Sequence, residues 1–161
     1  MAAILAANHH GKGRVRLSKV IRNGSRHTLL QFNVTILLEG PMTPAFVNGD
    51  NSIIIPTDTQ KNTVYVVARK SSFESAEEFA LLLARHFLAT YPRLVTRARI
   101  EVKQDLWERI VTPDSSGRER EHDHAFQKVG PHWTFARVEA TRSSAGLPVL
   151  KLWGGVKQLT V

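Results

Sequence analysis

Hydrophobic and polar residues alternate in two neighbouring stretches near the start of the chain, residues 14–22 and 27–39, which is the pattern of half-buried β-strands. The apolar faces are formed by Val15, Leu17 and Ile21 in the first stretch and by Leu30, Phe32, Val34, Ile36 and Leu38 in the second. Asn23-Gly24, between the two stretches, is a strong signal for a tight turn. The pattern therefore predicts a long antiparallel β-hairpin.

A helix is predicted over residues 75–91. Ser75 and Glu78 have the spacing of a capping box, in which each side chain satisfies a free backbone amide at the start of a helix. Apolar residues then recur at helical spacing until Pro92, which ends the segment. The positions on the predicted buried face are Phe79, Leu82, Leu83, His86 and Phe87.

A second helix is predicted to begin near Thr57, after the chain breaks at Gly40-Pro41 and passes through a mixed segment. Thr57 and Gln60 repeat the capping-box spacing. A helix would bring Val64, Val67 and Ala68 onto one face. The β-branched residues in 63–67 favour a strand instead, but the specific start signal makes a helix our prediction.

The later part of the chain returns to strand patterns. Residues 96–107 and 133–141 alternate, residues 147–161 are strand-like, and residues 112–123 are polar and predict a loop. The resulting order, β-β-α-α-β-β, predicts the α+β class, with one antiparallel sheet and two helices packed on one face. The last residues are apolar and predict an open strand edge, which we expect further sequence or a partner to complete.

Composition narrows the classes of function. The chain has 161 residues, a length that suits one domain. Its apolar fraction of 42% is too high for a disordered chain, and no apolar run is long enough for a membrane span. Cysteine is absent, which excludes disulfides, thiolate catalysis and cysteine-ligated metals. The first residues lack the basic region of a signal peptide, so a cytoplasmic location is expected.

A net charge of +8 indicates an anionic partner. One form of this hypothesis is a nucleic-acid-binding module that uses a basic sheet face. The arginines that could form it are Arg14, Arg16, Arg22, Arg97 and Arg99. No aromatic residues are interleaved with them to stack on bases. We therefore interpret these arginines as a solvated strand face rather than as a nucleic-acid-binding surface.

His122-Asp123-His124 would place two imidazoles on one side of a strand, an arrangement that metal sites use. No third ligand accompanies them, so a hydrogen-bonded loop at a sheet edge is favoured.

Two other positions could carry chemistry. Lys12 lies between Gly11 and Gly13, which allow tight backbone placement. Thr57-Asp58 would open a helix, whose free amides attract anions. On spacing alone, Lys12 is explained as a solvated lysine and Thr57-Asp58 as an ordinary helix cap.

A resemblance to a known family favours a functional role for these two positions. Asp50-Asn51-Ser52, followed by Thr57-Asp58-Thr59-Gln60-Lys61-Asn62-Thr63-Val64-Tyr65, resembles the signature of urate oxidase, or uricase. Further matches, in family order, are Gly11-Lys12, Glu77-Glu78-Phe79, His86-Phe87, His122-Asp123-His124-Ala125-Phe126 and Gly155-Val156-Lys157-Gln158-Leu159-Thr160-Val161. Together they span nearly the whole chain.

The resemblance implies a fold and an activity. The fold would be the tunnelling fold, or T-fold, an antiparallel β-β-α-α-β-β sheet with two helices on one face. Family subunits carry two such units, so residues 1–161 are expected to form a single unit like the N-terminal half, with the C-terminal half absent. The implied reaction, in purine catabolism, is the oxidation of urate by O₂ to 5-hydroxyisourate and H₂O₂, without metal or organic cofactor.

The resemblance also implies roles for three residues. Lys12 and Thr57 match the catalytic dyad, in which the lysine activates the threonine hydroxyl. Thr57 and Asp58 match positions that contact urate. The family's other site residues come from a second unit, so we expect this chain to supply half of an intersubunit site and to be inactive alone. The expected partners are urate, O₂, and either further copies of the chain or a complementing C-terminal half, and no membrane.

Two other functions stay open at this point. The first is a non-catalytic T-fold unit that binds a purine or supports an assembly. The second is the basic nucleic-acid-binding module. Disappearance of the ultraviolet absorbance of urate would separate the enzyme from both, and an affinity for nucleic acid that falls steeply with salt would support the second.

Overall fold

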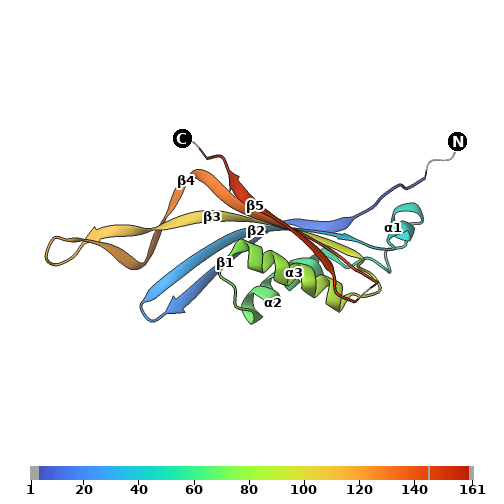
Figure 1. Cartoon of the computed structure of the whole chain (residues 1–161), viewed down its shortest axis with the longest axis horizontal. Coiled ribbons are helices and arrows are strands. Elements are labelled where there is room, and N and C mark those ends of the chain that lie inside the picture. Colours follow the sequence, from blue (N-terminus) through green and yellow to red (C-terminus); the bar gives the residue numbers. More distant parts are fainter. Residues whose placement is uncertain (1–3, 145, 160–161) are drawn as a thin grey trace.

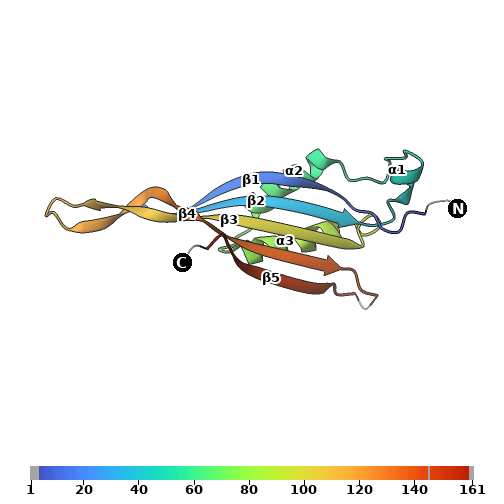
Figure 2. The ribbon, with the colours of Figure 1, turned by 90° about the horizontal axis from the view of Figure 1, so that it is seen from above.

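The computed structural model describes residues 4–144 and 146–159. Its strands form one sheet in the order β1-β2-β3-β4-β5, and every neighbouring pair is antiparallel. The strands are β1 (His10–Asn23), β2 (Arg26–Glu39), β3 (Arg97–Pro113), β4 (Glu119–Thr141) and β5 (Val149–Lys157), and the helices are α1 (Thr43–Val47), α2 (Thr57–Lys70) and α3 (Ala76–Thr90). Helices α2 and α3 cover one face of the sheet (Figures 1 and 2). The predicted α+β class is confirmed.

The predicted hairpin is confirmed as β1 and β2. Its turn passes through Gly24, whose φ of 59° lies in the left-handed region that glycine adopts without strain. The apolar face of β2 is buried beneath the helices, with Val34, Ile36 and Leu38 fully inaccessible to solvent. This face forms the centre of the core.

Both predicted helices are confirmed. Helix α3 buries Phe79, Leu83 and Phe87 as expected, whereas Leu82 and His86 are only half-buried. In α2 the buried positions include Val64, Val67 and Ala68. Phe79 of α3 stacks on Phe73, with ring centroids 4.4 Å apart. Their rings also contact Phe32 of β2, so the aromatic residues join helix α3 to the sheet.

The start of α3 confirms the predicted capping box with one change. Ser75 Oγ accepts a hydrogen bond from the amide of Glu78 at 3.1 Å. The carboxylate of Glu78 accepts from the amide of Glu74, at 2.8 Å, rather than from the amide of Ser75. Two amides at the start of the helix are therefore satisfied, as the motif requires.

The loop predicted over residues 112–123 is confirmed at its centre, but it is shorter than predicted. Strands β3 and β4 continue into this region as a two-stranded ribbon that extends beyond the rest of the sheet, and only residues 114–118 connect them (Figure 1). On β4, residues 122–125 stand opposite Ile110 alone, and residues 129–132 stand opposite Leu106 alone. These bulges interrupt the alternation on which a strand prediction depends, and the ribbon therefore has the sequence pattern of a loop.

Two elements extend the predicted β-β-α-α-β-β order. Helix α1 is a single short turn in the segment that was predicted only as mixed. The strand-like tail forms β5 at an edge of the sheet, and Thr160 and Val161 lie outside the described residues. The large exposed apolar side chains of β5 are Val149, Leu152, Trp153 and Val156. Strand β5 is therefore an apolar edge.

Candidate functional site

Lys12 lies on β1 beside a bulge that decides which face its side chain occupies. Val15 pairs with Val34 and Lys12 pairs with Ile36, so three steps along β1 match two steps along β2. Arg14, within this interval, has a φ of 58°. Because side chains alternate along a strand, the extra residue places Lys12 on the face that Val34 and Ile36 bury, where the helices pack.

At one of the two glycines beside Lys12, the neighbouring strand is too close for any other residue. A Cβ on Gly11 would overlap the carbonyl oxygen of Ile36 on β2, so only glycine allows the strands to approach there. A Cβ on Gly13 would lie 3.7 Å from its nearest neighbour, an atom of Thr35, which is an ordinary contact. The tight placement expected for Lys12 therefore depends on Gly11.

Helix α2 begins at Thr57 without a side-chain cap. The N-cap position is Pro56, and no side chain hydrogen-bonds to the first amides. The predicted capping box is wrong, because Thr57 is the first helical residue rather than the cap. Gln60 is instead fully buried, and its Nε2 donates to the carbonyl of Ile55 at 2.9 Å. The first turn consequently presents free N–H groups and the positive end of the helix dipole.

Asp58 lies in this first turn with an exposed carboxylate. It accepts a hydrogen bond from Lys61 Nζ at 2.9 Å. That hydrogen bond and the charge of Lys61 hold the pKa of Asp58 below its ordinary 3.8, and the charge of Lys12 lowers the pKa further. The same pairing raises the pKa of Lys61. The influence of Lys12 on Asp58 is the smallest of these effects, so its charge acts more weakly on Asp58 than that of Lys61 does.

Lys12 thus lies on the face of β1 that packs against α2, and Thr57 and Asp58 lie in the first turn of that helix. Lys12 and Thr57 are both half-buried. Across residues 4–144 and 146–159, no hydrogen bond or ion pair engages the Lys12 ammonium or the Thr57 hydroxyl. A lysine, a hydroxyl and the free amides of a helix end are groups that can together hold an anion and move its protons.

His10 adds a buried polar atom beside these residues, which the sequence interpretation missed. It pairs with Leu38 and precedes Lys12 by two positions, so both side chains belong to the same face of β1. Its Nε2 is buried with no hydrogen-bond partner among the described residues, as is Oδ1 of Asn8. Such atoms call for an explanation in a folded protein. His10 and Asn8 thus place two buried polar atoms on the N-terminal side of Lys12.

Lys19 is a second missed residue, and its role is structural. It lies on the helix face of β1, opposite Leu30. Its Nζ donates to the carbonyls of Ala68 at 3.0 Å and Ser71 at 2.7 Å, which close the C-terminal end of α2. It also lies 4.0 Å from the centre of the Phe73 ring. A charged residue at an apolar position of an alternating strand was the signal that could have identified it.

His122 and His124 lie in the bulged part of β4, not in a loop. Their rings are 4.6 Å apart, and His27 from the β1–β2 hairpin contacts His124 at 5.5 Å. His122 Nδ1 accepts hydrogen bonds from the amides of His124 and Ala125, at 3.2 and 3.1 Å. The hydrogen-bonded interpretation is therefore confirmed and its loop setting is wrong. In the described part of the chain, no group of three or more His, Asp or Glu side chains could hold a metal ion.

The arginines of the open sheet face are largely neutralised by carboxylates. Three of them form ion pairs across neighbouring strands: Arg97 with Glu39 at 3.2 Å, Arg99 with Glu139 at 2.9 Å, and Arg137 with Glu101 at 2.8 Å. Exposed pairs of this kind contribute little to stability. They do remove much of the positive charge that nucleic-acid binding would use.

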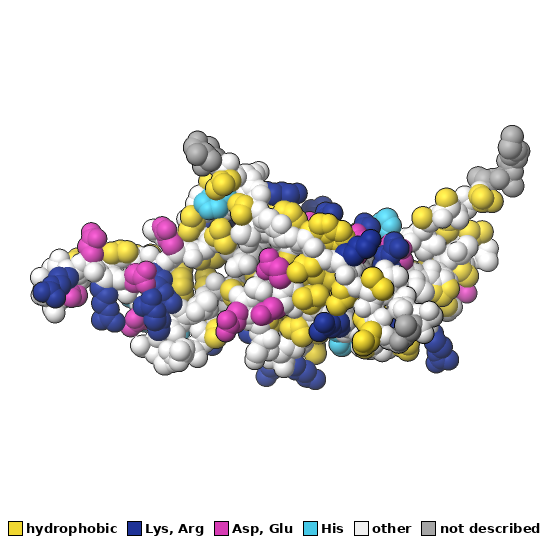
Figure 3. All heavy atoms as spheres, viewed as in Figure 1, with side chains coloured by type: hydrophobic (Ala, Val, Ile, Leu, Met, Phe, Trp, Pro, Cys, Tyr) yellow, Lys and Arg dark blue, Asp and Glu magenta, His cyan; other side chains and the backbone are white. Residues whose placement is uncertain are grey.

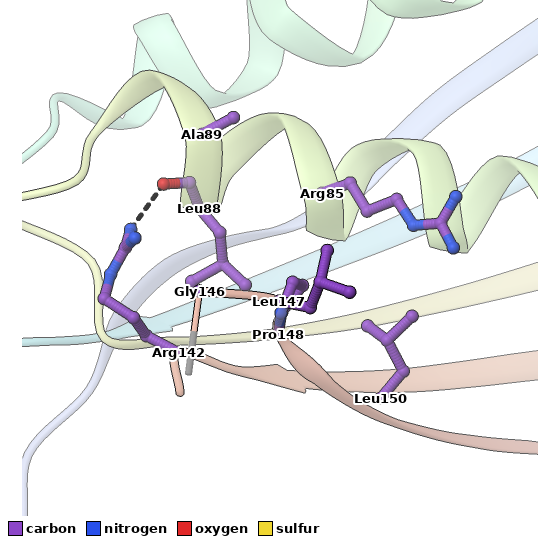
Figure 4. A pocket seen from close by; sticks show the side chains of 8 residues that line it. All are labelled: Arg85, Leu88, Ala89, Arg142, Gly146, Leu147, Pro148 and Leu150. Atoms are coloured by element: carbon purple, nitrogen blue, oxygen red, sulfur yellow. Dashed lines mark hydrogen bonds between the residues drawn. The ribbon is translucent and has the colours of Figure 1, made fainter. Parts of the chain in front are cut away.

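An apolar cavity of about 550 Å³ lies away from these residues, between α3 and the segment that leads into β5 (Figure 4). Its lining includes Leu88, Leu147 and Leu150, and none of its residues belongs to β1 or α2. Arg142 at its rim donates to the carbonyl of Leu88 at 2.5 Å. The cavity thus has no part in the chemistry of Lys12 and Thr57.

None of the helices in the described residues has the length and apolar character that crossing a membrane requires.

Comparison with known proteins identifies related sequences. The family model of uricase matches residues 8–139. The uricase of Arthrobacter globiformis is 39% identical over 158 residues, which cover 94% of this chain and 49% of the relative. The uricase of Dictyostelium discoideum is 41% identical over 128 residues, which cover 78% of this chain and 43% of the relative. The chain thus spans about half the length of these relatives.

Comparison of structures gives the same result. The crystal structure of uricase from Arthrobacter globiformis matches with a TM-score of 0.86 at 37% sequence identity. The match covers 100% of this chain and 50% of that chain. The T-fold that the sequence resemblance implied is therefore confirmed.

Proposed function

The chain belongs to the uricase family, and on this premise we propose that it supplies one half of a site that oxidises urate with O₂. The observation that carries the proposal is the junction of β1 and α2. There, Lys12 lies on the helix face of the strand and Thr57 begins an uncapped helix. We assign Lys12 and Thr57 as the catalytic pair, and Thr57 with Asp58 as the residues that hold urate.

Each role follows from the chemistry of the group. Urate is an anion, so the free amides of Thr57 and Asp58 and the helix dipole favour its binding. In this relay the Thr57 hydroxyl accepts a proton from urate and passes its own proton to Lys12 Nζ, a step that uses the neutral amine form of Lys12 and leaves it as the ammonium. The exposed carboxylate of Asp58 is paired with Lys61 and takes no proton in this scheme.

The proposed reaction balances without a metal or an organic cofactor. Urate loses two electrons to O₂, which leaves as H₂O₂ with two protons. Water adds at the oxidised carbon, and the product is 5-hydroxyisourate. The role of the protein is to orient urate and to move its protons, and positioning of this kind contributes several orders of magnitude in rate.

The remaining half of the site comes, in this proposal, from a second T-fold unit. We take residues 1–161 as one unit of this kind, because the chain spans about half the length of its uricase relatives. Strand β5 leaves an edge with exposed Leu152, Trp153 and Val156, which suits pairing with another chain. The partner is either a complementing C-terminal uricase half or further copies of this chain in a homo-oligomer.

The test joins residues 1–161 to the C-terminal half of the Arthrobacter globiformis uricase in one chain. We expect the chimera to remove the ultraviolet absorbance of urate and to release H₂O₂ in equal amount. The isolated chain is expected to do neither. A folded chimera that leaves urate unchanged would overturn the proposal, and if it still bound urate it would be a non-catalytic purine-binding module. Full activity of the isolated chain would overturn the half-site assignment.

A further inference from the structure

A polar cavity of about 350 Å³ opens on the face of the sheet that the helices leave uncovered, the face toward the viewer in Figure 2. Strands β1, β2, β3 and β4 all contribute to it. Its polar lining residues are Arg16, Gln31, Asn33, Lys103, Asp105 and Lys128. The cavity is separated from Lys12 and Thr57 by the sheet itself, so it is a distinct site.

The pairing of the strands explains why these side chains converge. Arg16 pairs with Asn33, and Asn33 pairs with Lys103 on the next strand. Gln31 and Asp105 form the neighbouring pair. Phe32, between Gln31 and Asn33, is buried in the core, so alternation sends both of its neighbours to the open face. Lys128 comes from β4 at the start of the bulge over 129–132.

The lining carries an excess of positive charge. Arg16, Lys103 and Lys128 are cationic, and Asp105 is the single carboxylate, which leaves a formal excess of two positive charges. The amides of Gln31 and Asn33 add neutral donors. This combination favours an anion with more than one negative charge.

The donors are only loosely committed to protein partners. Lys128 Nζ lies 3.3 Å and Lys103 Nζ lies 3.7 Å from the same Oδ1 of Asp105, longer than the roughly 2.7 to 2.9 Å of a charge-assisted hydrogen bond. Within residues 4–144 and 146–159, no ion pair or side-chain hydrogen bond engages Arg16 or Asn33. By contrast, Arg137 and Arg99 on the same face are closely paired with carboxylates.

We propose that this cavity binds a multiply charged oxyanion of the phosphate class, such as inorganic pyrophosphate or the phosphoryl group of a small metabolite. Arg16 supplies paired N–H donors, and the two lysines supply point charges. Asp105 lies near both lysines and is the one carboxylate of the lining that a bound anion would face. The site is independent of urate oxidation and would exist in a chain with no catalytic function.

Trp133 provides a direct reporter for the site. Lys103 Nζ lies 4.7 Å from the centre of its ring, and Trp133 pairs with Asp105. An anion that draws Lys103 toward the cavity changes the charge beside this indole. Fluorescence of Trp133 should therefore change on binding, and Trp133→Phe should remove that change while calorimetry still detects binding.

The experiment titrates pyrophosphate into the whole chain, with sodium chloride at matched ionic strength as reference. We expect saturable binding of one anion per chain. Arg16→Met and Lys128→Met should each raise Kd about tenfold or more, as for a lost hydrogen bond to a charged group. Lys151→Met is the matched control, because Lys151 lies on the same face outside the cavity.

Thermal unfolding of each variant confirms that it is folded before binding is compared. Asp105→Asn should retain or strengthen binding, since it removes the one negative charge. The proposal is overturned if pyrophosphate does not bind saturably. It is equally overturned if Lys151→Met weakens binding as much as Lys128→Met, because the effect would then be general attraction to a basic chain.

Discussion

The two ends of helix α2 face the same strand, and each faces a lysine. At the C-terminal end, Lys19 donates to the carbonyls of Ala68 and Ser71. At the N-terminal end, Lys12 makes no such bond among the described residues, and the first turn of α2 has no side-chain cap. A lysine that satisfies the last carbonyls of a helix stabilises the fold. A lysine beside free amides is available to a ligand.

The difference arises from one residue in β1. Lys19 belongs to the regular alternation that includes Val15, whereas Lys12 lies beyond the bulge. Without the bulge, Lys12 would occupy the open face, away from α2. The bulge thus places a lysine at each end of one helix, and only one of the two is used for packing.

Exchanging Lys12 for Met should have the largest effect on function. In the chimera with the second uricase half, Lys12→Met is expected to slow urate turnover about 10²-fold, because the relay loses its proton acceptor. The unfolding midpoint should hardly change, since Lys12 makes no hydrogen bond or ion pair with the residues that the structure describes. Steady-state rates and a thermal melt measure the two effects. If the variant lost stability instead of turnover, Lys12 would belong with Lys19 as a packing residue.

Gly11→Ala tests the placement of Lys12. A Cβ at Gly11 would overlap the Ile36 carbonyl, so β1 must shift, and we expect a loss of about 1 to 3 kcal/mol in the free energy of unfolding. Turnover of the chimera should fall as well. Gly13→Ala is the matched control, because its Cβ has room, and denaturant unfolding should show a smaller change. Equal losses for both would mean that the bulge, rather than the close approach at Gly11, sets the geometry.

Lys19→Met should give the reverse of the Lys12 result. Loss of its hydrogen bonds to two carbonyls is expected to lower the free energy of unfolding by about 2 kcal/mol. For a chain of this size, that corresponds to a midpoint lower by roughly 4 to 8 °C. Turnover below the midpoint should stay within about twofold of the parent. Lys70→Met, at an exposed position in the same helix end, is the control and should change stability by less than about 0.5 kcal/mol.

The smallest effect concerns the titration of Asp58. Its lowered pKa means that its pairing stabilises the fold above the ordinary value of 3.8 and that this contribution is lost as the pH falls through the lowered pKa. Carboxyl chemical shifts should show the pKa rising toward 3.8 in Lys61→Met and rising less in Lys12→Met. An unchanged pKa in Lys12→Met would place the Lys12 charge farther from α2 than the structure does.

Local sequence signals were sufficient to predict the hairpin and the helix α3. The Asn23-Gly24 turn and the alternation on either side of it predicted the hairpin, because nothing interrupts the period between 15 and 38. The apolar period in residues 75–91 predicted α3, whose buried face matches. In both cases the local pattern and the tertiary packing agree.

Other features depend on contacts that a local pattern does not contain. Thr57 and Gln60 have capping-box spacing, but Pro56 moves the start of α2 by one residue and Gln60 is drawn into the core to bond the Ile55 carbonyl. The part of the β3–β4 ribbon within residues 112–123 was predicted as a loop, because its side chains are polar and a bulge at residues 122–125 breaks the period of two.

The residues of the candidate site were predicted from the family resemblance. Their geometry could not be predicted from the sequence. The position of Lys12 on the helix face depends on a bulge in which Arg14 takes a left-handed backbone conformation. A residue other than glycine gives no sequence signal for that conformation. The sequence pattern did not single out His10, because its buried Nε2 results from the packing of β1.

The most direct test of the central claim is a double-variant measurement in the chimera, because Lys12 and Thr57 are proposed to act as one relay. Thr57→Ala should slow turnover about 10²-fold, as Lys12→Met does, while Thr57→Ser should keep most of the rate. If the relay is one unit, the double variant Lys12→Met with Thr57→Ala will be little slower than the slower single variant. If the two losses multiply to about 10⁴-fold, the residues act separately and the assignment of a catalytic pair is wrong.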